Sequence, residues 1–375
     1  MDSLRQLHSA ISSAFQYFSG TMRRDANSHQ SPAPWIRTPC IYSEALSKVA
    51  GCNIYLKLEN LQPGGSFKSR GIATLIARAA ARAAPDRPPH FYCSSGGNAG
   101  LACITAAKAL GYRATIVVPL STPQHMVALI EARGADVHQV GASWAEADAH
   151  MRDELMSKDE SAVYVPPFDH PDIWDGHSTM VDELAELDVP LHGIVCSVGG
   201  GGLLNGIMAG VEARSWAEKP RILAVETAGA DSLNLCARTG EHAMLDGITS
   251  IATTLGARRV SRRSYEWLSS ENLSSIVVHD WEAAMSCVRF ADDARFVIEP
   301  ACGATIAAAY FRGEAGENRL RTAFGREGLE WKDHNVVLIV CGGSSASLEL
   351  LRQYAQKYGD IAAAAAAPVT NGAPS

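Results

Sequence analysis

Short apolar segments alternate with helical segments through most of this chain. Buried strands are predicted at residues 90–94, 114–118, 193–198, 221–226 and 336–341. Helices are predicted at residues 72–81, 99–110 and 203–213. Short apolar strands that alternate with helices form parallel sheets, which helices cover on both faces. The sequence therefore predicts an α/β fold, in which ligands bind beyond the carboxyl ends of the strands.

Charge and cysteine content argue against several classes of protein. The 33 basic and 40 acidic residues give a net charge of -7, and basic residues form no long block, so no nucleic-acid partner is expected. The nine cysteines include no Cys-x-x-Cys pair, which is typical of reduced thiols in a cytoplasmic protein without zinc or disulfides. No apolar run reaches the length of a membrane span, so no membrane partner is expected.

The two ends of the chain differ from the middle. Residues 1–34 are predicted to be an N-terminal extension with apolar residues at helical spacing, namely Leu4, Leu7, Ile11, Phe15 and Phe18. This pattern indicates an amphipathic helix, and a mitochondrial presequence is the alternative, although Asp2 and the scarcity of arginine argue against it. Residues 361–375, an alanine run followed by Pro, Thr, Asn and Gly, are predicted to be a disordered tail.

A run of four glycines follows the predicted strand at 193–198 and consists of Gly199, Gly200, Gly201 and Gly202. Without Cβ atoms the backbone can approach an anion closely, and the N-terminus of the next helix adds a favourable dipole. No Gly-Lys-Ser/Thr sequence follows, so the run is not a nucleotide-binding P-loop. A flexible connector is the alternative, but four glycines cost conformational entropy, and we interpret the run as a phosphate site.

Two further strand ends carry polar loops. The motif Ser-Gly-Gly-Asn-Ala-Gly at 95–100 offers N–H groups and a hydroxyl to a carboxylate, although Asn98 could instead cap the next helix. Cys341 lies at the end of the last predicted strand and is either a small buried hydrophobic residue or a weak hydrogen-bond partner for a ligand. Glu299 precedes another apparent helix and is either a buried acid or an ordinary helix-terminus charge.

Lys68 lies between Phe67 and the helical stretch at 72–81, just after a Pro-Gly-Gly turn signal. The electropositive start of a helix disfavours a protonated amine, and Schiff-base chemistry needs an amine that loses its proton near neutral pH. Taken alone, Lys68 would be a solvated surface lysine. Together with a phosphate loop, a carboxylate loop and a thiol, it predicts a site for a phosphate-bearing aldehyde cofactor and an amino-acid substrate.

These motifs, in this order, resemble those of the fold-type II pyridoxal-phosphate enzymes, and within them the catabolic L-serine/L-threonine dehydratases. The resemblance extends from about Trp35 to about Tyr358. It implies a fold like that of the tryptophan synthase β subunit, with two open, twisted, mostly parallel sheets and helices on both faces. The large, cofactor-binding domain would comprise residues 35–63 and 166–360, and the small domain residues 64–165. The resemblance also implies a homodimer.

The resemblance further implies the contacts of pyridoxal 5'-phosphate. Lys68 would bond covalently to the cofactor's aldehyde and later abstract the Cα proton of the substrate. Phe67 would lie against the cofactor ring, Asn98 would bind the ring hydroxyl and Cys341 would face the ring nitrogen. The phosphate would be held by backbone N–H groups of Gly199, Gly200, Gly201, Gly202 and Leu203.

Two more sets of residues are implied. The substrate carboxylate would be bound by Ser95, Gly96, Asn98 and Ala99. A monovalent cation, potassium, would be held largely through carbonyl oxygens by Glu226, Ala230, Ser232, Leu255 and Ala257.

The implied activity is β-elimination, which converts L-serine to pyruvate and ammonia and L-threonine to 2-oxobutanoate and ammonia. Racemases of this fold are one alternative, but they place a serine where this chain has Gly96. β-Replacement enzymes usually have threonine in place of Ala99, and a catalytically silent cofactor-binding protein is opposed by intact Lys68 and Asn98. Many dehydratases have alanine at the position of Gly96, so we expect extra space beside the substrate.

Overall fold

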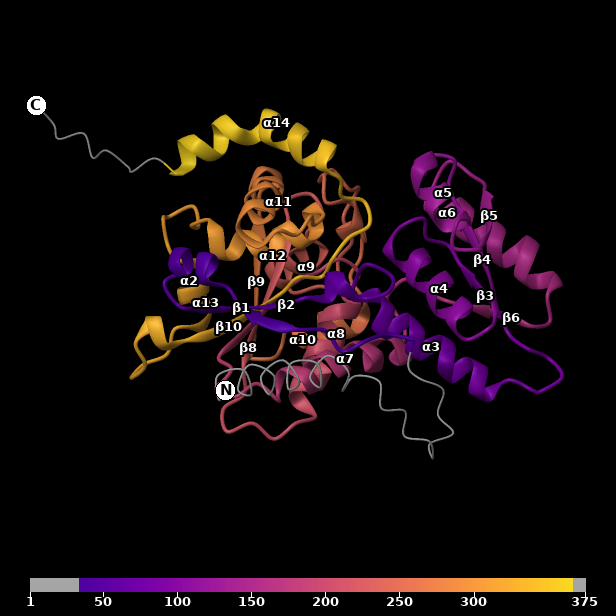
Figure 1. Cartoon of the computed structure of the whole chain (residues 1–375), viewed down its shortest axis with the longest axis horizontal. Coiled ribbons are helices and arrows are strands. Elements are labelled where there is room, and N and C mark those ends of the chain that lie inside the picture. The colour runs from indigo at the N-terminus through magenta and orange to yellow at the C-terminus, as the bar shows by residue number, and fades with distance from the viewer. Residues whose placement is uncertain (1–33, 367–375) are drawn as a thin grey trace, which may run out of the picture. The chain divides into compact units, whose positions relative to one another are not determined.

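The computed structural model describes residues 34–366, whose larger sheet has six strands in the order β1-β2-β10-β7-β8-β9 (Figure 1). Its strands are β1 (Cys40–Tyr42), β2 (Asn53–Lys57), β7 (Gly193–Ser197), β8 (Arg221–Thr227), β9 (Leu273–Val278) and β10 (Asn335–Ile339). β1 runs antiparallel to β2, and all other neighbouring strands are parallel. Because β10 pairs with both β2 and β7, segments nearly 300 residues apart meet in the centre of this sheet.

The second sheet has four strands in the order β5-β4-β3-β6, and all of its pairs are parallel. These strands are β3 (His90–Cys93), β4 (Arg113–Val118), β5 (Asp136–Gln139) and β6 (Ala162–Tyr164). All four residues of β3 are buried, as is typical of a parallel strand covered on both faces. The two sheets confirm the predicted mostly parallel α/β architecture.

Helices cover both faces of the sheets (Figure 1). They are α2 (Glu44–Ala50), α3 (Lys68–Arg82), α4 (Asn98–Ala109), α5 (Gln124–Glu131), α6 (Trp144–His150), α7 (Pro171–Leu184), α8 (Gly202–Glu212), α9 (Ser232–Thr239), α10 (Arg262–Trp267), α11 (Asp280–Ala294), α12 (Pro300–Tyr310), α13 (Arg319–Phe324) and α14 (Leu348–Ala366). α7 packs against both α3 and α8, and α11 packs against α12 and α14. No described helix is long and apolar enough to cross a membrane.

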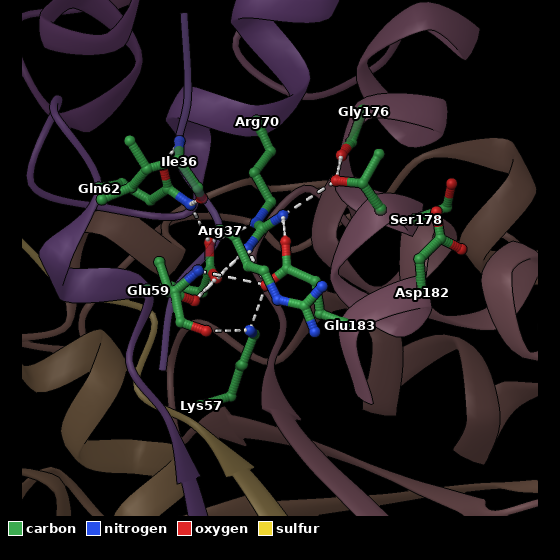
Figure 2. Close-up of polar contacts among 12 residues, drawn as sticks. Ile36, Arg37, Lys57, Glu59, Gln62, Arg70, Gly176, Ser178, Asp182 and Glu183 are labelled. Atoms are coloured by element: carbon green, nitrogen blue, oxygen red, sulfur yellow. Dashed lines mark hydrogen bonds and ion pairs between the residues drawn. The ribbon is translucent and has the colours of Figure 1, made fainter. Parts of the chain in front are cut away.

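A buried ionic cluster fixes the first turn of α3 (Figure 2). Arg70 is fully buried and bonds to Glu59 (Nη2 to Oε1, 2.8 Å) and Glu183 (Nη1 to Oε1, 2.6 Å). Lys57, on β2, forms a second ion pair with Glu183, on α7. The cluster therefore joins β2, α3 and α7 two residues after Lys68.

The predicted strands and helices are confirmed, with ends that shift by a few residues at most. The predicted disordered tail is wrong over residues 361–366, which continue α14. The run Ala362–Ala366 extends this helix because alanine has the highest helix propensity of all residues. The predicted N-terminal helix lies outside the described residues, as do residues 367–375. The division into large and small domains stays a prediction.

Candidate active site

Lys68 is the first residue of α3, and its side chain is partly buried. Its Nζ donates a hydrogen bond to the carbonyl oxygen of Pro167. Burial lowers the pKa of Lys68 to about 8, although Cys93, Cys341 and Glu299 act in the opposite direction. Burial therefore favours the neutral form of the amine. The sequence analysis expects this preference only from the position of Lys68 at a helix start.

Backbone pairing holds the loop after β10 against the segment that carries Lys68. The amide of Phe67 donates to the carbonyl of Cys341, and that of Gly343 donates to the carbonyl of Gly65, both at 3.1 Å. Gly342 has a φ of +105°, and a Cβ there would lie 2.3 Å from the Gly65 carbonyl oxygen. Only glycine allows this close approach, which brings the thiol and the amine to one place.

The thiol of Cys341 is buried beside two polar neighbours. Its Sγ lies 3.7 Å from Ser197 Oγ, at the end of β7. A hydrogen bond with Cys302 and burial together hold the pKa of Cys341 well above its ordinary value. The group at this strand end is therefore a neutral thiol at physiological pH.

The four-glycine loop joins β7 to α8, and the walls around it leave no room for side chains. A Cβ at Gly200 would lie 2.4 Å from the Phe168 ring, and one at Gly201 would lie 1.9 Å from Ser264 Oγ. Gly201 also has a φ of +92°. No described residue accepts a hydrogen bond from the backbone amides of residues 199–203. Unpaired amides at a helix N-terminus are the groups that bind phosphate.

Asn98 brings three of the sequence motifs together. It is the first residue of α4, and Gly97 takes the cap position, so the alternative that Asn98 caps this helix is wrong. Asn98 Nδ2 donates to Glu299 Oε1 at 2.8 Å. Its Oδ1 accepts from the amide of Ser344 at 3.0 Å and from the hydroxyl of the same residue at 2.9 Å. The loop at 95–100 thus contacts both the start of α12 and the loop after β10.

The space beside Gly96 differs from what the sequence predicted. A Cβ at Gly96 would lie 2.7 Å from Thr122 Cγ2 and 3.1 Å from Val118 Cγ1. Thr122 therefore fills the volume that the missing side chain leaves. At the next residue, Gly97, a Cβ would meet nothing within 4 Å. Open space in this loop lies beside Gly97, next to Ser95 Oγ, which accepts from the Gly97 amide at 3.4 Å.

Glu226, one of the five positions implied for a cation, lies near the end of β8. Glu226 is fully buried and accepts hydrogen bonds from the amides of Leu233 (2.9 Å) and Asn234 (2.7 Å). Burial raises the pKa of Glu226 to about 8. Leu255 lies against the glycine loop, since a Cβ at Gly199 would be 3.0 Å from Leu255 Cα.

The other three positions are Ala230, Ser232 and Ala257. Ala230 and Ser232 precede and open α9, and the amide of Ala257 donates to the carbonyl of Leu255 at 2.7 Å. Among residues 34–366, no group of three or more His, Cys, Asp or Glu side chains could hold a metal ion.

One buried residue near Lys68 escaped the sequence analysis. The ring of His177 packs against that of Phe67, with 4.9 Å between the ring centroids. Burial holds the pKa of His177 well below its ordinary value, so the ring is neutral. A Cβ at Gly71 or Gly206 would lie within 2.6 Å of His177. These residues lie on three different helices, so no local sequence pattern predicts that they are in contact.

The chain is similar to known proteins of one family. The family model for pyridoxal-phosphate-dependent enzymes matches residues 33–342 of the chain. The chain belongs to this family. The catabolic L-serine/threonine dehydratase of Saccharomyces cerevisiae is 41% identical over 317 residues, which cover 81% of this chain and 86% of the relative. A serine dehydratase-like protein of Mus musculus is 43% identical over 321 residues, which cover 84% and 92% of the two chains.

Solved structures of the family share the fold of this enzyme. A fungal L-serine ammonia-lyase from Rhizomucor miehei is similar at a TM-score of 0.77 and 34% identity, covering 86% of this chain and 99% of its own. Maize serine racemase is similar at a TM-score of 0.71 and 24% identity, which shows a likeness of fold alone.

The residues of this enzyme fit pyridoxal phosphate. The loop at 199–203 presents unpaired amides to a phosphate, and Lys68 offers an amine whose pKa is about 8. Asn98 keeps one N–H free of the contacts described above, and Cys341 offers a neutral thiol. The family membership and the local chemistry therefore agree on the cofactor.

Proposed function

We propose that this enzyme is a lyase that deaminates L-serine to pyruvate and ammonia by β-elimination, and that it also converts L-threonine to 2-oxobutanoate. The names of the relatives support this substrate class. One observation carries the proposal for this chain: Lys68, whose pKa is lowered by burial, opens α3 where the backbone amide of Phe67 pairs with the carbonyl of Cys341. 

The cofactor contacts follow from the groups that the chain provides. When bound, pyridoxal phosphate supplies an aldehyde that condenses with amines and a ring that withdraws electrons from Cα. The amides of Gly199, Gly200, Gly201, Gly202 and Leu203 would bind its phosphate. Phe67, whose ring packs against that of His177, would lie against the cofactor ring. Asn98 would donate to the ring hydroxyl, and Cys341 would face the ring nitrogen.

Lys68 would serve as both anchor and base. With a pKa of about 8, roughly a fifth of its side chains are neutral at pH 7.4, against about a thousandth for an ordinary lysine. A neutral amine at this place can take the Cα proton of the substrate, and general bases of this kind contribute about 10²- to 10⁴-fold to the rate. The amides and hydroxyl of Ser95, Gly96, Asn98 and Ala99 would hold the substrate carboxylate.

Cys341 would favour elimination over transamination. Because its pKa is raised, Cys341 offers a weak neutral hydrogen bond to the ring nitrogen and cannot hold that nitrogen protonated as a carboxylate would. A less electron-withdrawing ring favours prompt loss of the β-hydroxyl. Replacing Cys341 with Asp should therefore raise the share of transamination, and unchanged partitioning would contradict this role.

We further propose a potassium ion at Glu226, with carbonyl groups of Ala230, Ser232, Leu255 and Ala257. The support is a buried acid without a positively charged partner among the described residues, whose ionised form a cation would stabilise. A homodimer in the cytoplasm is part of the same proposal and rests on the family resemblance and the cysteine usage.

Racemisation is the second candidate and is less favoured. Gly96 has no hydroxyl, whereas the racemases of this fold place a serine at this position. 

The direct test mixes the purified, cofactor-loaded protein separately with L-serine and L-threonine and assays 2-oxo acid and ammonia. We expect product from L-serine and from L-threonine. If neither substrate yields product while the bound-cofactor chromophore is present, the dehydratase proposal is wrong and the cofactor assignment stands.

A further inference from the structure

Glu299 stands where a helix-capping residue would, yet its side chain does not cap the helix. It precedes Pro300 at the start of α12, and its carboxylate makes no hydrogen bond to the first turn. The residue is 2% exposed. Glu299 is therefore a buried acid and not an ordinary helix-terminus charge.

The carboxylate of Glu299 instead accepts from three side chains. Its Oε1 accepts from Asn98 Nδ2 and from Thr254 Oγ1, each at 2.8 Å. Its Oε2 accepts from Ser345 Oγ, also at 2.8 Å. Gly343 gives this carboxylate its space, because a Cβ there would lie 2.2 Å from Glu299 Cδ. Three separate segments are thus arranged around one acid.

These contacts fix which way the amide of Asn98 points. Its Oδ1 already accepts from the N–H and the hydroxyl of Ser344, and one of its two N–H groups goes to Glu299. A flipped amide would place Oδ1 against the carboxylate and its NH₂ group against the Ser344 amide, so both contacts would become repulsive. The orientation observed leaves a single N–H of Asn98 for a ligand.

We propose that Glu299 is a positioning residue, which accepts from Asn98 and thereby aims the remaining N–H of that amide at the ring oxygen of the bound cofactor. The proposal rests on the cofactor contact proposed above for Asn98. Glu299 itself acts through Asn98. Ser344 orients the same amide from its opposite side, because it donates two hydrogen bonds to Asn98 Oδ1.

The test measures cofactor affinity and ring orientation, which do not depend on turnover. Pyridoxal phosphate is titrated into the cofactor-free protein, and the dissociation constant and the induced circular dichroism of the bound chromophore are recorded. Glu299→Ala should weaken binding about tenfold, since a hydrogen bond of roughly 1.4 kcal/mol is lost, and should reduce the dichroism. Glu299→Gln keeps an acceptor oxygen for Asn98 and should bind within about threefold of the parent protein.

Glu282 provides a matched control. It is another buried glutamate in the first turn of a helix, on the neighbouring α11, and it pairs with Arg319. Glu282→Ala should lower thermal stability without changing the dissociation constant of the folded protein. If Glu282→Ala weakens the cofactor as much as Glu299→Ala does, the effect is only structural and the proposal is wrong.

A double-mutant cycle tests whether Glu299 acts through Asn98. In an Asn98→Ala background, Glu299→Ala should cause no further loss of affinity. Additive losses would contradict the proposal, as would a Gln variant as weak as the Ala variant. If Glu299→Ala does not fold, Ser344→Ala tests the contacts on the other side of the Asn98 amide. This variant should weaken cofactor binding about threefold, since the backbone amide of residue 344 still donates. An unchanged constant there would overturn the proposal. The dissociation constants and the dichroism can be interpreted even if the enzyme does not act on L-serine.

Discussion

The buried carboxylates around Arg70 and the buried carboxylate of Glu299 have partners that differ in charge. Around Arg70, the acids Glu59 and Glu183 are paired with two cations (Figure 2). Hydrogen bonds from Arg70 and Lys57 lower the pKa of Glu183, although burial acts against them.

Glu299 accepts only from neutral donors among the described residues, and burial raises its pKa. Within the paired cluster each charge compensates another, so removing one partner leaves an uncompensated buried charge. Unpaired buried groups, such as Glu299, Lys68 and Glu226, cost stability and are the ones that a ligand can complete.

The largest expected effect concerns the paired cluster. Glu183→Ala leaves Lys57 buried without its carboxylate and Arg70 with only Glu59, so we expect a loss of about 3–5 kcal/mol in the free energy of unfolding. Urea denaturation measures it. The nearby Glu186, whose pair with Arg37 is exposed, is the control, and its alanine variant should leave the free energy of unfolding nearly unchanged. Equal losses would remove the distinction between paired buried and exposed charges.

The next effect concerns the amine of Lys68. Only the neutral amine bonds to the cofactor's aldehyde, and the pKa of Lys68 is about 8. The rate at which the chromophore forms in cofactor-free protein should rise about tenfold per pH unit below pH 8 and level off above it. Stopped-flow absorbance measures this rate. A rate that keeps rising up to pH 10 would mean that Lys68 has the pKa of an ordinary surface lysine.

A third, smaller effect tests Glu226. Replacing potassium by tetramethylammonium should lower the free energy of unfolding by about 1.4 kcal/mol when potassium had been present at ten times its dissociation constant. Thermal unfolding in the two salts at equal ionic strength measures the difference. Glu226→Gln should abolish it, and a Gln variant that responds like the parent protein would exclude Glu226 from a cation site.

The smallest effect concerns the filled space at Gly96. Gly96→Ala pushes the new Cβ against Thr122, so we expect the KM for L-serine to rise about threefold with little change in kcat. Adding Thr122→Ala removes the clash and should restore KM, while Thr122→Ala alone is the control. If the double variant is no better than Gly96→Ala, the volume beside Gly96 does not matter to substrate binding.

Local sequence patterns predicted the parts of this enzyme that depend on the local chain. The glycine run at 199–202, Lys68 at the start of α3 and the Asn98 loop all follow buried strands or turns that composition makes visible. What could not be predicted depends on contacts between distant segments. Asn98 and Glu299 are 201 residues apart, and only their contact shows that Glu299 is a buried acid and not an ordinary helix-terminus charge.

The same reason explains the errors. Gly96 indicated extra space because the sequence does not show that Thr122 fills it. The tail prediction treated the alanine run as low complexity, although α14 extends into it from a packed first half.

Lys68 is the central claim, and one comparison tests it most directly. The test incubates the cofactor-loaded parent protein and the Lys68→Ala variant, reconstituted with pyridoxal phosphate, separately with L-serine. The amounts of pyruvate and ammonia released by each protein are then measured. The parent protein should release the two in equal amounts, and Lys68→Ala should release neither above background at unchanged thermal stability. Equal release by both proteins would contradict the account.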